Sequence, residues 1–195
     1  MKRELHPAEI RGLRELYAFS RQLVDHWSDL AERIGAETPT AAALRSGAGA
    51  ARELLGELEP VTAGYDLHGR PAAQGLGGAI ARQRTAVRDR FLERGQAVRF
   101  AVEEIVHLCV LLGYLARAAQ AADDSELADF CLRWERKLRR HEGTARKAAA
   151  ELGADPGGAI EPLHGSGVGK ALHGVGYALG TAGEWFDRRA SRRGS

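Results

Sequence analysis

The chain has 195 residues, the size of a single compact domain, and its 44% hydrophobic and 28% charged residues are typical of a globular protein. A formal net charge of +2 excludes a global electrostatic attraction to nucleic acids or membranes, so such binding would need a local basic patch. Two cysteines, Cys109 and Cys131, are too few for a disulfide framework or a thiolate zinc site.

The first residues, MKRELHPAEIRGL, contain no apolar signal-peptide core, and no stretch approaches the roughly 20 apolar residues that span a bilayer. We therefore expect a cytoplasmic protein. The first helix is predicted from Pro7 to Gly35, because apolar residues recur there with helical spacing. Its buried face comprises Leu13, Leu16, Tyr17, Ser20, Leu23, Val24, Trp27, Leu30 and Ile34.

The second helix is predicted to begin at Pro39, with Thr38 as its N-cap, and to end at Glu59, before Pro60. Its SGAGAA segment is a weak point, since glycine costs about 1 kcal/mol relative to alanine inside a helix. Residues 60–78 contain many glycines and prolines without periodicity, and this composition predicts a long irregular connection.

The third helix is predicted from Ala79 to Ala122, with an interruption near Gly95, and the fourth from Ser125 to Leu152. No alternating β-branched run occurs anywhere in the sequence. The predicted fold is therefore all-α, with a four-helix bundle over residues 1–153 and a long crossover between its second and third helices.

The C-terminal part is predicted to form a linker at 154–167, a glycine-rich helix at 168–188 and a basic tail at 189–195. Residues 105–116 are apolar around nearly the whole helix, so we expect another element to pack against the side that faces away from the bundle. The C-terminal helix is such an element, with apolar residues at helical spacing, and an interface with a second copy of the chain is the alternative. The apolar residues are Val168, Leu172, Val175, Leu179, Ala182 and Phe186.

The stretch HGSGVGKAL, residues 164–172, has some features of a phosphate-binding loop but fails its rule. His164 stands where the first glycine is required, and Ala171 stands where a magnesium-binding hydroxyl is required. No strand precedes the stretch either. We therefore expect no nucleotide binding.

The stretch LLGYLARAAQAADDSELADFCLRWERKLRRHEG resembles the last two helices of the ferritin-like superfamily, especially its small bacterial stress-associated members. Both share an alanine-rich helix, a short acidic turn and a helix that begins with ELA and carries a late histidine. The resemblance implies a bundle that could hold two metal ions through one carboxylate on each of two helices and a Glu-x-x-His pair on each of the others.

This metal-ligand pattern is degenerate here. Leu138 precedes His141 where the pattern has glutamate, and the second helix has no histidine. What remains is Glu104-x-x-His107 on the third helix. On helical wheels His107 and His141 point toward different layers, so we expect each to be satisfied by a backbone carbonyl or by Glu103, Glu104 or Glu142.

The favoured interpretation is a non-catalytic bundle with a structural or interaction role and no cofactor, acting as a homo-oligomer or with a protein partner. No serine has the strand-to-helix elbow or histidine partner of a nucleophile. One alternative is an iron- or manganese-binding protein of oxidative-stress handling that uses Glu104, His107 and His141, with carboxylates such as Asp25 or Glu53. The other is a peripheral partner of anionic membranes or nucleic acids through the basic run 133–147 and the tail.

Overall fold

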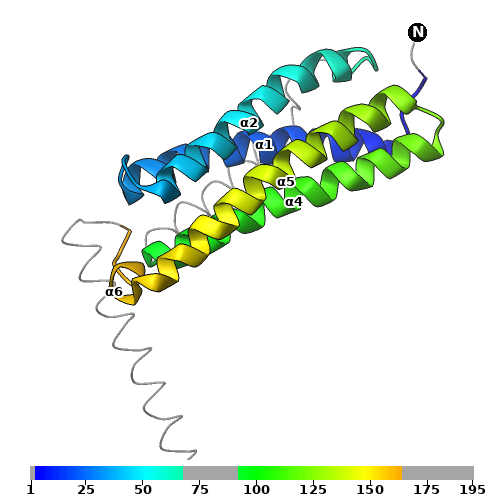
Figure 1. The fold of residues 1–195 in the computed structure, drawn as a ribbon. Helices are drawn as coiled ribbons and strands as arrows, with labels where there is room; N and C mark the ends of the chain where they lie inside the picture. The colour runs from blue at the N-terminus through cyan, green and yellow to red at the C-terminus, as the bar shows by residue number, and fades with distance from the viewer. Residues whose placement is uncertain (1–2, 68–91, 164–195) are drawn as a thin grey trace, which may run out of the picture.

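The computed structural model describes residues 3–67 and 92–163, and four long helices packed side by side make up most of this part (Figure 1). The described residues contain no β-strand. The prediction of an all-α fold with four long helices is thus confirmed. The helices are α1 (Pro7–Ile34), α2 (Pro39–Ala63), α4 (Arg94–Ala121) and α5 (Ser125–Glu151), followed by the short turns η1 (Leu152–Ala154) and α6 (Pro156–Ala159).

Local capping chemistry fixes the ends of α1. His6 precedes the helix, and its Nδ1 accepts a hydrogen bond from the Ala8 N–H at 3.2 Å, while its own N–H donates to the Glu9 carboxylate at 2.9 Å. These two bonds satisfy donors that the first helical turn would otherwise leave unpaired. Gly35 ends the helix with a positive φ of 110°, a backbone conformation that glycine adopts without a side-chain clash.

The N-cap of α2 is Thr38, as predicted, and its hydroxyl accepts a hydrogen bond from the Ala41 N–H at 3.1 Å. The predicted end at Glu59 is wrong, because α2 continues through Pro60 to Ala63. A proline removes one backbone donor but leaves its own carbonyl available. The N–H of Gly64 donates to the Pro60 carbonyl at 3.2 Å, so the helix gains one further turn.

Helix α4 begins at Arg94, and Glu93 before it has extended backbone angles. The part of the predicted third helix before residue 92 lies outside the described residues, so the structure shows this helix from Arg94 onward. Asp124 caps α5 by accepting a hydrogen bond from the Leu127 N–H at 3.1 Å, and α5 ends within one residue of its predicted end.

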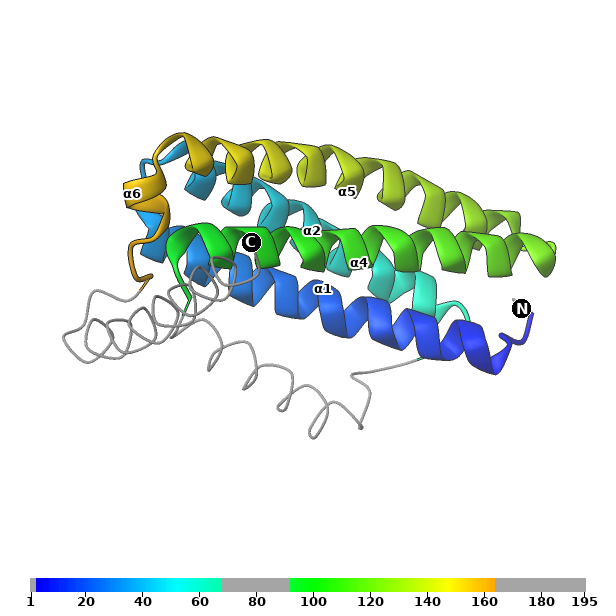
Figure 2. The ribbon, with the colours of Figure 1, turned by 90° about the horizontal axis from the view of Figure 1, so that it is seen from below.

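The four helices form a ring in which neighbouring helices run antiparallel: α1 lies beside α2 and α4, and α5 lies beside α2 and α4. The residue pairs in contact fix these directions. Along α2 and α5, Ser46 meets His141 and Glu57 meets Arg133, so residue numbers rise on one helix as they fall on the other. Consequently α2 ends and α4 begins at opposite ends of the bundle (Figures 1 and 2).

The core is a continuous cluster of leucine, alanine and tryptophan side chains. Trp27 of α1 and Trp134 of α5 are both fully buried. Gly47 lies in the SGAGAA segment of α2, where a Cβ atom would stand 2.3 Å from the Trp27 ring. The segment that looked weak by helix propensity is therefore the place where α2 packs closely against the largest side chain of α1.

Residues 154–163 of the predicted linker fold back onto the start of α4. The N–H of Arg94 donates to the Glu161 carbonyl at 2.9 Å, and the N–H of Leu163 donates to the Leu92 carbonyl at 3.3 Å. The side chain of Leu163 is buried. This part of the chain is thus a set of turns fixed to the bundle rather than a free linker.

The other predictions for the C-terminal part and the crossover concern residues that the structure does not describe. These are residues 68–91, the phosphate-loop-like stretch 164–172, the helix 168–188 and the tail 189–195. Among the described helices, none is both long enough and apolar enough to cross a membrane.

Candidate functional site

The structure does not bring together the three candidate metal ligands, Glu104, His107 and His141. Glu104 lies on α4 and faces α1, where its carboxylate is 2.8 Å from Nδ1 of His26. Both side chains are largely buried, with exposed fractions of 13% for Glu104 and 6% for His26. Glu104 therefore already has an imidazole partner, and that partner belongs to a different helix from His107.

His107 lies on the outer side of the contact between α4 and α1. Its Nε2 is 3.0 Å from the carboxylate of Glu15, and its ring lies against the ring of Phe19 with centroids 4.4 Å apart. The expectation that a glutamate of α4 or α5 would satisfy this histidine is wrong. Glu15 comes from the neighbouring α1, which the sequence of α4 alone could not indicate.

His141 lies on the opposite side of the bundle, between α5 and α2. Its Nδ1 is 3.3 Å from the hydroxyl of Ser46, which replaces the carbonyl or glutamate partner expected from the sequence. Partial burial, together with the positive charges of Lys137 and Arg140, holds the pKa of His141 below its usual value. Both effects favour the neutral form of the imidazole.

The bundle interior between these sites is apolar. The buried polar residues of the described segments are Glu9, Ser20, His26 and Thr40. Within residues 3–67 and 92–163, no group of three or more histidine, cysteine, aspartate or glutamate side chains could hold a metal ion. A two-metal ferritin-like centre needs four carboxylates and two histidines directed into the bundle, and the described residues do not supply that arrangement.

His26 is the polar residue of this region that sequence reasoning missed. His26 precedes Trp27 in α1 but does not belong to the apolar pattern from which the buried face of this helix was predicted. The pattern therefore gave no reason to expect that His26 is buried. His26 could have been identified from the antiparallel register of α1 and α4, in which Gly12 contacts Leu115 and His26 contacts Glu104. That register depends on how the two helices pack and cannot be derived from the sequence of either helix alone.

A second polar cluster, which we call the end cluster, lies where α1 begins. The guanidinium group of Arg3 binds the Glu9 carboxylate at 2.5 and 2.9 Å and that of Asp124 at 3.1 Å, and the Tyr65 hydroxyl donates to Asp124 at 2.7 Å. Arg3 holds the pKa of Glu9 below its usual value, although burial opposes this shift. Burial and the Asp124 carboxylate raise the pKa of the Tyr65 hydroxyl. The end cluster thus joins the N-terminal segment, the end of α2 and the turn between α4 and α5.

The basic run on α5 has acidic partners on α2. Glu57 accepts hydrogen bonds from Arg133 at 2.6 Å and from the indole N–H of Trp134 at 3.2 Å. Arg133 also holds the pKa of Glu57 below its usual value. Lys137 pairs with Glu53, and its ammonium group lies 4.5 Å from the centre of the Trp134 ring. These cations cover the indole at the edge of the core.

Further along α5, basic residues pair within the helix itself. Arg139 binds Glu135 at 2.7 Å, and Arg146 binds Glu142, both one helical turn apart. Four of the seven basic residues in the run 133–147 therefore have a carboxylate partner. This pairing is typical of a solvated amphipathic face rather than of a phosphate-binding surface.

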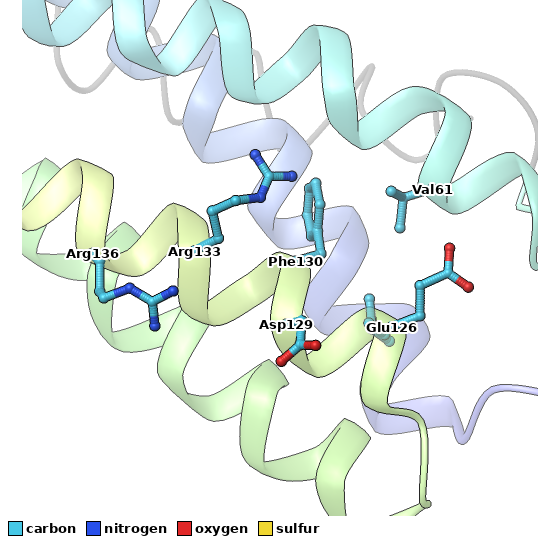
Figure 3. Close-up of a pocket in the computed structure, with 7 residues that line it drawn as sticks. Val61, Glu126, Asp129, Phe130, Arg133 and Arg136 are labelled. Carbon is cyan, nitrogen blue, oxygen red and sulfur yellow. The ribbon is translucent and has the colours of Figure 1, made fainter.

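A shallow groove lies between the end of α2 and the start of α5 (Figure 3). Phe130 and Val61 face each other across it, and Glu126 and Arg133 lie at its borders. Its lining contains no histidine, cysteine or serine. The groove can contact another molecule, but it offers no nucleophile or imidazole base for chemistry.

Comparison of the chain with protein-family models, curated proteins and solved structures found no match in any of the three. The resemblance to ferritin-like proteins therefore stays a prediction.

Proposed function

We propose that the protein is a non-catalytic helical bundle of ferritin-like topology with a structural or interaction role. The observation that carries this proposal is the separate pairing of the three candidate ligands. Glu104 binds His26, His107 binds Glu15 and His141 contacts Ser46, while hydrocarbon fills the interior. A bundle built in this way is held together by packing, and its three candidate ligands are each paired with a protein side chain rather than directed to a shared site.

The ferritin-like part of the proposal rests on helix order and direction. The helices α2 and α4 begin at the same end of the bundle, so the residues between them must return along its whole length. At about 1.5 Å per residue, the 25 residues of α2 span roughly 37 Å. The 30 residues 64–93 can cover that distance easily, since an extended chain reaches about 3.3 Å per residue. We infer a long crossover there, as in ferritin-like bundles.

Metal analysis of the full-length protein, purified without a histidine tag, tests the proposal. The protein is incubated with iron(II) or manganese(II), dialysed and analysed for bound metal, and its thermal unfolding is followed with and without the ion. We expect well under one ion per chain and an unchanged unfolding midpoint, because a resident ion would stabilise the folded state.

The matched variants are His107→Ala and His141→Ala. Stoichiometric iron or manganese that is lost in both variants would establish the metal-binding alternative and end our proposal.

A third outcome is binding to anionic vesicles or duplex DNA that weakens steeply with salt and disappears on deletion of residues 186–195. That result would replace our proposal with a peripheral membrane or nucleic-acid role.

A further inference from the structure

Two helix ends meet at the end cluster, and both have the same backbone conformation. At the end of α2 the N–H of Leu67, and at the end of α4 the N–H of Asp124, donates to the carbonyl five residues earlier, at 3.1 and 2.9 Å. Each bond closes a turn that contains a residue with positive φ, a position where glycine is usual. Here the two residues are Asp66 and Asp123, with φ of 58° and 56°, and no other non-glycine residue of the described chain has a positive φ.

A left-handed residue that has a side chain needs support from its surroundings. Its Cβ atom crowds the following carbonyl, so aspartate is less stable in this conformation than glycine would be. Asp66 follows Tyr65 and Asp123 precedes Asp124, and the Tyr65 hydroxyl donates to the Asp124 carboxylate at 2.7 Å. Burial and this carboxylate raise the pKa of Tyr65, which therefore remains a donor. The hydrogen bond thus fixes the end of α2 to the turn between α4 and α5.

The N-terminal segment is held by the same carboxylate oxygen. The Nε of Arg3 donates to the Asp124 oxygen that also accepts from Tyr65, and its other two nitrogens bind Glu9. The N–H of His6 also donates to Glu9. The exposed fractions of the Glu9 and Asp124 side chains are 3% and 10%, so these bonds to charged groups are shielded from water.

Residues 3–6, which we call the strap, lie over the end of the bundle where α4 turns into α5 (Figures 1 and 2). Leu5 of the strap is buried, although it precedes the first helix. The strap and the last turns of α4, including Tyr114 and Ala118, line a hollow of about 720 Å³. Release of the strap would therefore uncover Leu5 and widen this hollow.

We propose that the end cluster is a latch that couples the strap to the point where the chain leaves α2. A buried carboxylate that loses its cation turns toward water, because an unpaired buried charge is costly. When Arg3 leaves, Asp124 turns away from Tyr65 as well, and the two left-handed helix ends lose their support. Binding at the strap that displaces Arg3 is thereby transmitted to residues 64–67. The coupling is reciprocal, and it does not depend on the proposed function.

Hydrogen exchange of the backbone amides, followed by NMR on the full chain without an N-terminal tag, tests the coupling. Arg3→Ala should speed exchange at residues 65–67 and 123–124 by about tenfold or more, because loss of one partner of a buried charge makes local opening that much more frequent. The turn between α1 and α2 lies at the other end of the bundle. There the N–H of Thr38 donates to the Gly35 carbonyl, and its exchange should match that of the wild type.

Tyr65→Phe tests the reverse direction and keeps the buried ring. It should speed exchange at Glu9 and Ile10, whose N–H groups donate to the carbonyl of His6 in the strap. The matched control is Arg146→Ala, which removes an arginine from an exposed pair with Glu142 on α5. This control should leave exchange unchanged at both the strap and the end of α2.

Acceleration confined to residues 4–10 in Arg3→Ala would overturn the proposal, because the strap would then move alone. Equal acceleration in the middle of all four helices would also overturn it, since that pattern means a loss of global stability rather than the opening of one end. If Arg3→Ala fails to fold, Tyr65→Phe decides alone. Wild-type exchange at Glu9 and Ile10 in that variant contradicts the coupling.

Discussion

Replacing Gly47 by alanine should destabilise the protein, although helix propensity alone predicts the reverse. At an exposed helix position, replacing glycine by alanine stabilises the helix by about 1 kcal/mol. At Gly47 the added Cβ would stand 2.3 and 2.7 Å from two atoms of the Trp27 ring, closer than van der Waals contact allows. The indole is rigid and fully buried, so the ring or the whole of α2 must move.

Overpacking of a core costs about 1–3 kcal/mol, and a clash with a rigid ring lies toward the upper part of that range. After subtraction of the propensity gain of about 1 kcal/mol, we expect Gly47→Ala to lower the free energy of unfolding by about 1–2 kcal/mol. The matched control is Gly49→Ala, two residues along the same helix, where a Cβ would meet nothing within 4 Å. That variant should gain about 0.5–1 kcal/mol.

Urea unfolding followed by circular dichroism measures both differences, and the thermal midpoint should shift by about 2–4 °C for each kcal/mol in a protein of this size. Equal stabilisation by Gly47→Ala and Gly49→Ala would refute the packing of α2 on Trp27. A double-mutant cycle with Trp27→Phe isolates the contact, since the smaller ring should make Gly47→Ala less harmful than it is with tryptophan present.

Two further predictions concern buried groups. Glu9 has a pKa below its ordinary value near 4.5 because of Arg3, so its contribution to stability is present above that pH and is lost as the pH falls through the folded-state pKa. Glu9→Gln should therefore lower the free energy of unfolding by about 1–3 kcal/mol at pH 7, with a difference from wild type that shrinks in urea titrations below about pH 4.5. The buried thiols of Cys109 and Cys131 should resist alkylation at pH 8 in the native protein, and both should react in denaturant, as counted by mass spectrometry. Rapid labelling of either native thiol would show that the core opens readily.

The parts of the fold that follow from the sequence are those decided by local chemistry. Thr38 before Pro39, Gly35 after Ile34 and Asp124 before Ser125 each supply a capping group or a left-handed residue where a helix must begin or end. The error at Pro60 has a local cause as well. A proline removes a single donor, and near a C-terminus one further turn can still form when later N–H groups find carbonyls.

The candidate site could be predicted only in part, because helical periodicity gives the direction of a side chain on its own helix and not the identity of its neighbour. The expectation that His107 and His141 point to different layers agrees with their positions against α1 and against α2. Their partners, Glu15 and Ser46, are about 90 residues away along the chain. Choosing these partners requires the order and register of the helices in the ring, which the spacing within one helix does not contain.

Residues 105–116 show the same limit of helical periodicity. The sequence shows that this segment is apolar on nearly every side, but it does not show which sides pack against other helices. Two sides of this segment are used by the described bundle, because α1 and α5 pack against α4. The third side keeps Val110 and Tyr114 in solvent, between the exposed charged residues Glu103 and Arg117. The spacing of apolar residues within this segment could not distinguish its two packed sides from the side that keeps Val110 and Tyr114 in solvent, because that distinction depends on which helices lie beside it.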